Sequence, residues 1–137
     1  MERVRKITIT IKEFPHNKNL NLNEELLWLS DVLGLFDSKR DREKSKFRLF
    51  IELIKARKEH QFLTSDELAE RARLTRGTII HHIHDLEELG YVTYKNNKYY
   101  LSEKNIELLF RDIKRDFDDF YSEIKEIAKK LDQELEL

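Results

Sequence analysis

The order of local signals between residues 63 and 101 restricts this chain to few folds, because it predicts two short helices in close succession. Thr64, followed three residues later by Glu67, fits a capping box, which satisfies free N–H groups where a helix begins. Leu74 breaks the helical pattern, and Thr75 can cap a second helix. The spacing leaves only a short turn between the two helices.

The second helix and the segment after it carry their own signals. Ile79, Ile83 and Leu86 fall at i, i+4 and i+7, so they predict one buried stripe. Gly90 suits the left-handed position that follows a helix. Two runs of residues rich in aromatic and β-branched side chains follow, with a pair of asparagines between them. Because asparagine can adopt positive φ, this order predicts a tight hairpin. The two strands and the turn are expected at residues 91–94, 98–101 and 96–97.

These elements resemble a winged helix-turn-helix domain of the ArsR/MarR-like kind. The likeness rests on LTSDELA at residues 63–69, LTRGTIIHHI at 74–83 and LEELGYV at 86–92. The TRGTIIHH core is similar to small archaeal predicted transcriptional regulators. The resemblance implies a mainly α fold with a small β-hairpin wing, and a regulator that binds double-stranded DNA.

Fold alone does not settle function, so two other classes stay open. One is a protein-interaction winged helix of the transcription or replication machinery. Residues 64–89 favour it, because they hold six acids and only three arginines. The other is an architectural DNA-binding protein without sequence preference. Residues 39–48 hold six bases and two acids, which fits phosphate contact and a solvated helix start equally well.

Composition narrows the classes further. With 137 residues, 39% of them hydrophobic, the chain is one domain with extensions and can bury a core. It has no cysteine, no long apolar run and no signal-peptide core near its start. P-loop, dinucleotide and zincin motifs are also missing. We therefore expect a cytoplasmic protein that is not an enzyme, does not associate with membranes and needs no cofactor.

The N-terminal part predicts a strand and a helix ahead of the winged domain. Residues 4–11 alternate, with Ile7, Ile9 and Ile11 on one face and Thr8 and Thr10 on the other, which is a strand signal. A loop follows, and Asn23 can cap a helix that runs to about Phe36. Residues 41–58 predict the first helix of the winged domain. The expected organisation is support and dimerisation at 1–38, DNA binding at 39–102 and dimerisation at 103–137.

A heptad pattern of apolar residues runs through the C-terminal part. It predicts a helix of about 30 residues, or about 45 Å, which is too long to bury its seam on so small a domain. We expect a two-fold dimer through this helix, with help from the N-terminal strand and helix. The alternative is a cover over the N-terminal helix of the same chain. The expected interface residues are Ile106, Phe110, Ile113, Phe117, Phe120, Ile124, Ile127, Leu131 and Trp28.

The second helix of the pair is the expected recognition helix, at about residues 75–89. Its first residues would reach base edges in the major groove, where Arg76 could bond guanine and Gly77 would permit close approach. Ile80 could meet a thymine methyl, and hydroxyls and lysines would meet the sugar-phosphate backbone. The expected DNA contacts are Ser65, Thr75, Arg76, Gly77, Thr78, Ile80, His81, His84, Lys95, Asn96, Asn97 and Lys98.

Histidines on this helix also suggest a metal site. His81 with His84 or Asp85 could share an ion, whereas His82 is expected to pack at the edge of the buried stripe. One helix supplies too few ligands, and the chain has no thiolate. We therefore expect no metal site, and the ligand arithmetic disfavours a metal or small-molecule effector.

Overall fold

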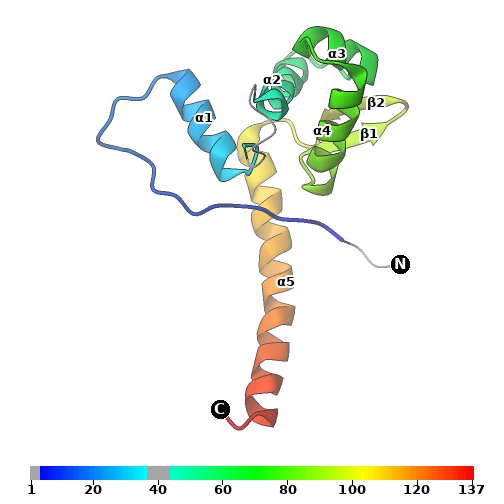
Figure 1. The fold of residues 1–137 in the computed structure, drawn as a ribbon. Helices are drawn as coiled ribbons and strands as arrows, with labels where there is room; N and C mark the ends of the chain where they lie inside the picture. The colour runs from blue at the N-terminus through cyan, green and yellow to red at the C-terminus, as the bar shows by residue number, and fades with distance from the viewer. Residues whose placement is uncertain (1–3, 37–43) are drawn as a thin grey trace. The chain divides into compact units, whose positions relative to one another are not determined.

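The computed structural model describes residues 4–36 and 44–137, and within them the chain forms five helices and one hairpin (Figure 1). The elements are α1 Leu22–Val32, α2 Ser45–Lys58, α3 Ser65–Ala72, α4 Arg76–Glu88, β1 Val92–Lys95, β2 Lys98–Leu101 and α5 Ile106–Glu134. They belong to two compact units, Met1–Ser102 and Glu103–Leu137. The predicted fold class is confirmed: a mainly helical winged helix-turn-helix with a long C-terminal helix. None of the helices in the described residues has the length and apolarity to cross a membrane.

The caps of α3 and α4 lie where the sequence predicts them. The Thr64 hydroxyl accepts from the N–H of Glu67 at 3.2 Å, and the Glu67 carboxylate accepts from the N–H of Thr64 at 3.1 Å. The Thr75 hydroxyl accepts from the N–H of Thr78 at 3.2 Å. Arg73 adopts the left-handed conformation with φ 57°, which ends α3 and turns the chain into α4. The predicted helix-turn-helix is therefore confirmed at its termini.

The core of the first unit lies where α2, α3 and α4 meet. Each large apolar side chain buried there contributes about 1.5–3 kcal/mol. Phe50 and Tyr91 pack ring against ring at 6.2 Å, and the Tyr91 hydroxyl donates to the carbonyl of Leu33 at 3.5 Å. The predicted stripe on α4 is confirmed. The central side chains, each at most 1% exposed, are Leu49, Phe50, Leu53, Leu68, Ile79, Ile83, Leu86 and Tyr91.

The hairpin pairs β1 and β2 antiparallel, with Lys95 opposite Lys98. Asn96 and Asn97 have φ of 55° and 63°, which confirms the predicted two-residue turn. The first strand begins at Val92 rather than at residue 91, because Tyr91 is drawn into the core and its N–H bonds the carbonyl at the end of α4. Residue 63 extends the sheet: Leu63 and Tyr99 exchange two backbone hydrogen bonds of 3.1 and 2.7 Å.

The predicted N-terminal strand is wrong, although the segment is extended. Residues 4–15 contain no strand. Lys6 donates its N–H to the carbonyl of Glu88 at 3.2 Å, and Thr10 donates to that of Val32 at 3.0 Å. These acceptors are free carbonyls at the C-terminal ends of α4 and α1. The alternating pattern correctly indicated an extended backbone. The hydrogen-bond partners of that backbone are helix ends rather than a second strand.

The first helix differs from its predicted limits at both ends. Its cap is Asn21 rather than Asn23, and Asn21 forms a complete capping box with Glu24. It ends at Val32 rather than near Phe36, because Gly34 adopts φ +78° and reverses the chain. The predicted start of the next helix at residue 41, and the first half of the basic run at 39–48, lie outside the described residues.

Tyr91 predicts a loss of stability at alkaline pH. Burial raises the pKa of Tyr91 to about 12, which the nearby Arg5 only partly opposes. The folded protein therefore holds the phenolic proton more tightly than the unfolded chain, whose pKa is near 10. The resulting stability is complete below pH 10 and is lost as the pH rises towards 12. By pH 11 the free energy of unfolding should fall by about 1 kcal/mol relative to the same change in Tyr91→Phe. Denaturant titrations of both proteins over a series of pH values measure this difference. If the free energy of unfolding falls equally with pH in the two proteins, the prediction is contradicted.

Candidate nucleic-acid interface

The helix α4 separates a buried face from an exposed arc. Ile79, Ile83 and Leu86 are buried in the core. At 100° per residue the opposite side carries the candidate DNA contacts, and these are exposed to solvent. They are Arg76, Gly77, Ile80, His81 and His84. The structure therefore leaves the predicted reading face of this helix uncovered.

Arg76 lies at the first turn of α4, with its side chain 71% exposed. Its Nε lies 3.7 Å from the carboxylate of Asp66 on α3, which is 76% exposed. An ion pair this exposed contributes little stability, so the guanidinium can exchange Asp66 for another acceptor at little cost.

The hydroxyls at the helix starts are partly engaged. The Thr75 and Thr78 hydroxyls lie 2.8 Å apart and share a hydrogen bond, and Thr75 also caps the helix. Thr78 is half-buried, as is Ser65 at the start of α3, whereas Thr75 is exposed. Among the three, Thr75 is best placed to meet a phosphate oxygen beside the N–H groups of the helix terminus.

The tip of the hairpin is exposed at all four predicted residues, which are Lys95, Asn96, Asn97 and Lys98. The Tyr94 hydroxyl donates to the Asn97 amide oxygen at 3.1 Å, which ties the turn to β1. Tyr94 also packs against Tyr99 across the sheet at 4.7 Å, and Tyr100 stacks on Phe62 at 4.3 Å. These tyrosines are packing partners, and the tip presents two lysines on opposite strands.

Of the three basic residues of the 39–48 run that the structure describes, only Lys44 is exposed. Lys46 is only 6% exposed, and its Nζ lies 3.1 Å from the carboxylate of Asp85 on α4. Arg48 is half-buried and donates to the carbonyl of Ala72 at the end of α3. Sequence reasoning missed this role, because nothing local to a lysine in a charged run indicates that a remote carboxylate will bury it.

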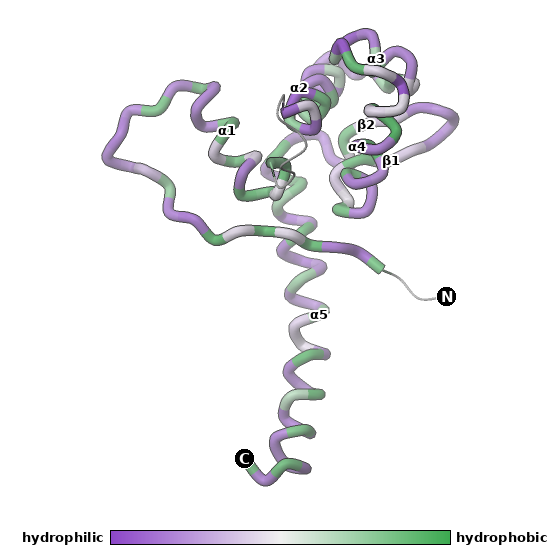
Figure 2. The backbone as a smooth tube through the Cα atoms, viewed as in Figure 1, coloured by the Kyte–Doolittle hydropathy of each residue, from purple (hydrophilic) through white to green (hydrophobic). Residues whose placement is uncertain are grey.

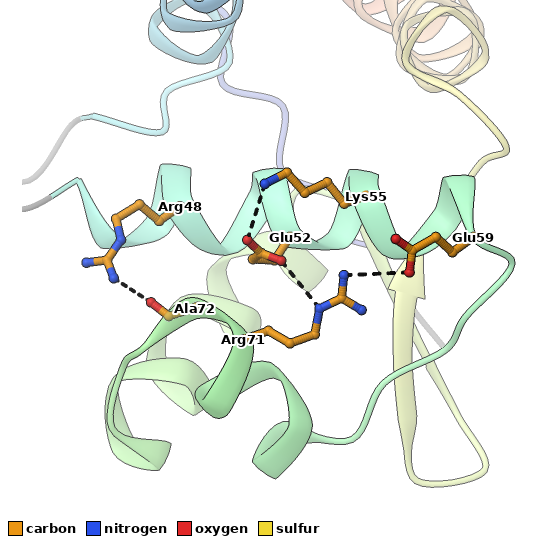
Figure 3. A network of polar contacts seen from close by, with 6 residues as sticks. All are labelled: Arg48, Glu52, Lys55, Glu59, Arg71 and Ala72. Carbon is orange, nitrogen blue, oxygen red and sulfur yellow. Dashed lines mark hydrogen bonds and ion pairs between the residues drawn. The ribbon is translucent and has the colours of Figure 1, made fainter.

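Arg48 belongs to a polar network that joins α2 to α3, shown in Figure 3. Arg71 of α3 contacts Glu52 at 3.4 Å and Glu59 at 3.9 Å, and Lys55 contacts Glu52 at 3.7 Å. Both Arg71 and Glu52 are shielded from solvent. The network sets α3 at a defined angle on α2, and α3 in turn supports the start of α4.

The histidine cluster forms with a different membership from the one predicted. Ligand atoms of His81, His82 and Asp85 lie within 4.8 Å of one another, whereas His84 is not in the group. His82 is buried, as predicted, and its Nε2 lies 2.6 Å from the Ser45 hydroxyl. Asp85 already pairs with Lys46. Two of the three groups therefore join α4 to α2, and a metal ion would compete with a nearly buried ammonium group.

The acidity of residues 64–89 is partly internal. Glu67 closes the capping box of α3, and hydrogen bonds from Thr64 hold the pKa of its carboxyl below the ordinary value. Asp85 pairs with Lys46 within the domain, and Asp66 pairs with Arg76. Of these three acids, Asp85 is balanced by a nearly buried lysine, whereas Glu67 keeps its charge and Asp66 depends on Arg76 for its partner.

The helix α5 carries the predicted interface residues along one side. Figure 2 shows apolar and polar residues alternating along its whole length. Ile113 is buried, and Ile106 and Phe110 are half-buried. Trp28 on α1 is half-buried, with its ring 5.0 Å from Phe14. The remaining predicted residues are 43–58% exposed: Phe117, Phe120, Ile124, Ile127 and Leu131.

The geometry of α2, α3, α4 and the hairpin, with the uncovered face of α4, is that of a DNA-binding helix-turn-helix domain. Comparison with known families agrees: residues 48–101 match a family described as HTH domain, which is a DNA-binding class rather than an enzyme class. The match spans α2 from its first turn, α3, α4 and both strands. No curated protein and no solved structure matches the chain significantly.

Proposed function

We propose that the chain is a sequence-specific transcriptional regulator that binds a two-fold DNA site as a homodimer. The recognition helix is α4, which enters the major groove, and the hairpin tip lies on the sugar-phosphate backbone. The observation that carries this proposal is the uncovered arc of α4, which starts with an exposed arginine and an unobstructed glycine. The resemblance of residues 63–92 to ArsR/MarR-like regulators, and to small archaeal regulators, supports this proposal.

Arg76 supplies the expected base contact. The guanidinium presents two parallel N–H groups that match O6 and N7 of guanine. Its position at the first turn of α4 is the one from which a recognition helix reaches base edges. Asp66 orients the side chain in the free protein and is exchanged for the base on binding. His81 and His84 follow on the same arc and reach the neighbouring bases or phosphates.

The other contacts position the domain on the duplex. Lys95 and Lys98 at the hairpin tip each neutralise a phosphate, and the Thr75 hydroxyl with the start of α4 binds another. The hairpin turn has only two residues, so its reach into the minor groove is shallow. These contacts give affinity without sequence information, and Arg76 gives the discrimination.

The homodimer forms through α5. The helix spans 29 residues, or about 44 Å, and from Phe117 onward its apolar seam is exposed. A second copy of the same helix would bury this seam by the knobs-into-holes packing of a heptad pattern. In this proposal residues 103–137 dimerise, 39–102 bind DNA and 1–38 support the dimer. Two α4 helices related by a two-fold axis would then read two half-sites.

Mobility shifts on genomic fragments over a series of salt concentrations test the function. A specific regulator prefers some fragments, and the preference survives competitor DNA. An architectural protein binds all fragments alike and weakens uniformly with salt. A protein-interaction module, which the acids of residues 64–89 favour, shifts none at micromolar concentration. Either of the last two results would overturn the proposal.

Gly77→Ala tests whether the start of α4 approaches DNA. No atom lies within 4 Å of the position that a Cβ would take, so alanine fits the free protein. Replacing glycine inside a helix should raise the free energy of unfolding by about 1 kcal/mol. The same methyl would intrude between helix and duplex and weaken DNA binding by about 1–3 kcal/mol.

The readouts for Gly77→Ala are thermal unfolding and DNA affinity measured on the same preparation. Ser122→Ala on α5 is the control, because it changes an exposed helical residue outside the domain. A variant that is more stable and binds DNA as well as the parent would show that this turn does not meet the duplex.

A further inference from the structure

The N-terminal extended segment keeps one edge of its backbone open. In an extended chain the N–H and C=O groups of successive residues point to opposite edges. Lys6 and Thr10 use their N–H groups on the ends of α4 and α1, so the even-numbered residues face the helices. The odd-numbered residues turn their backbone groups the other way. Among the described residues, none forms a backbone hydrogen bond with Ile7, Ile9 or Ile11.

This open edge has the chemistry of a strand that lacks a partner. Residues 7–11 read ITITI, which is β-branched throughout and carries no charge. Ile9 is 39% exposed and Ile11 fully exposed. Proteins usually protect such an edge with charges, proline or a covering element, because it is a template for pairing with another chain. Residues 7–11 contain neither a charged residue nor a proline.

We propose that this edge pairs antiparallel with the same segment of a second copy, forming a two-stranded ribbon across the two-fold axis. The inference rests on the homodimer proposed above and adds a second contact to it. An interface in which an edge pairs with the same edge of a second copy is isologous. It satisfies the edge of each subunit, so the assembly closes at two subunits.

The best register places Ile9 opposite Ile9 of the second copy. Ile7 then lies opposite Ile11 of the second copy, and all three isoleucines form hydrogen-bonded pairs, about six hydrogen bonds in total. The same register sets Arg5 opposite Glu13 of the second copy, which places opposite charges at both ends of the ribbon. The Arg5 Nε already donates to the carbonyl of Leu89 in its own chain at 3.4 Å, so Glu13 of the second copy would add a further acceptor.

The register has one kind of like-charged pair, which occurs twice by symmetry, and one lysine of each pair is already balanced. Lys6 lies opposite Lys12 of the second copy, but Lys12 pairs with Asp31 of its own chain at 2.5 Å. A shift by two residues would move Arg5 opposite an isoleucine and leave Ile11 without an isoleucine partner. Charge and side-chain pairing therefore favour the same register.

Single cysteine variants of the full-length protein test this pairing, because the parent has no cysteine. Hydrogen-bonded partners lie about 5.5 Å apart between Cα atoms, within the range that a disulfide bridges. Ile9→Cys should therefore form a symmetric intermolecular disulfide under mild oxidation. In Ile7→Cys or Ile11→Cys alone, the two equivalent sulfurs lie on residues about 13 Å apart along the ribbon, too far to join. An equimolar mixture of these two variants should cross-link. Non-reducing gels read the products, and circular dichroism checks the fold.

The outcomes separate this inference from the homodimer itself. Cross-linking of Ile9→Cys and of the mixture, but not of Ile7→Cys or Ile11→Cys alone, supports the ribbon. If light scattering shows a dimer and Ile9→Cys cross-links no better than Ile7→Cys, the ribbon is wrong and the dimer through α5 stands. If the parent is monomeric at micromolar concentration, both proposals fail together.

Discussion

Phe117→Asp combined with Ile124→Asp should convert the protein to monomers. The two side chains are 48% and 43% exposed on α5 and lie on the proposed seam. Burying an apolar side chain of this size contributes about 1.5–3 kcal/mol, and the dimer loses four of them. The aspartates also bring like charges together in a desolvated interface. Together these losses should raise the dimer dissociation constant at least about a thousandfold. Light scattering over a concentration series measures the change.

The same variant should lose affinity for a two-half-site duplex while it keeps its fold. Its first unit, Met1–Ser102, carries no substitution, so circular dichroism should still show it folded, with a lower unfolding midpoint only because the stabilisation by the dimer is lost. The matched control is Ser122→Asp with Gln133→Asp, which adds the same charge to α5 on sides away from the seam. This control should remain dimeric and bind DNA. A dimer that survives the seam variant would show that α5 is not its core.

Arg76→Ala should weaken binding to the preferred duplex by about 1–3 kcal/mol, or 5- to 150-fold, and relax discrimination at one base pair. The Arg76 side chain is exposed, and its ion pair with Asp66 spans 3.7 Å. Its removal should therefore leave the free energy of unfolding nearly unchanged. Binding to random DNA should fall much less, because the arginine reads a base edge rather than a phosphate. Competition assays with single-base variants of the site measure both effects.

Two further variants separate charge from geometry at this position. Arg76→Lys keeps the positive charge but loses the paired N–H groups, so it should restore affinity for random DNA and not discrimination. Arg115→Ala removes a similarly exposed, ion-paired arginine on α5. It should change neither the affinity for random DNA nor the base discrimination. Unchanged base preference in Arg76→Ala would contradict the placement of α4 in the major groove.

The candidate interface shows how far local reasoning reaches. Thr64, Thr75 and the Asn96-Asn97 turn are predicted correctly, because each is specified by hydrogen bonds or φ values within three residues. The buried stripe of α4 is also predictable, since its period matches the helix. The DNA contacts themselves remain predictions, because the local sequence around an exposed side chain does not specify what that side chain binds.

The errors share one cause, which is dependence on a remote residue. The extended N-terminal segment is evident from its alternation, but its acceptors belong to residues 22 and 82 positions further along the chain. Lys46 reads as part of a basic run, yet a carboxylate 39 residues away buries it. The histidine cluster changes membership because the Ser45 hydroxyl holds His82.

The amino-acid sequence by itself determined the starts of α3 and α4, the hairpin turn, the two faces of α4 and the heptad seam of α5, because these features depend on neighbours within a turn or two. Only the tertiary structure decided which charges lie inside and which edge of the N-terminal segment stays open. Those outcomes depend on desolvation and on hydrogen-bond partners, and both are set by elements that the fold brings together from distant parts of the chain.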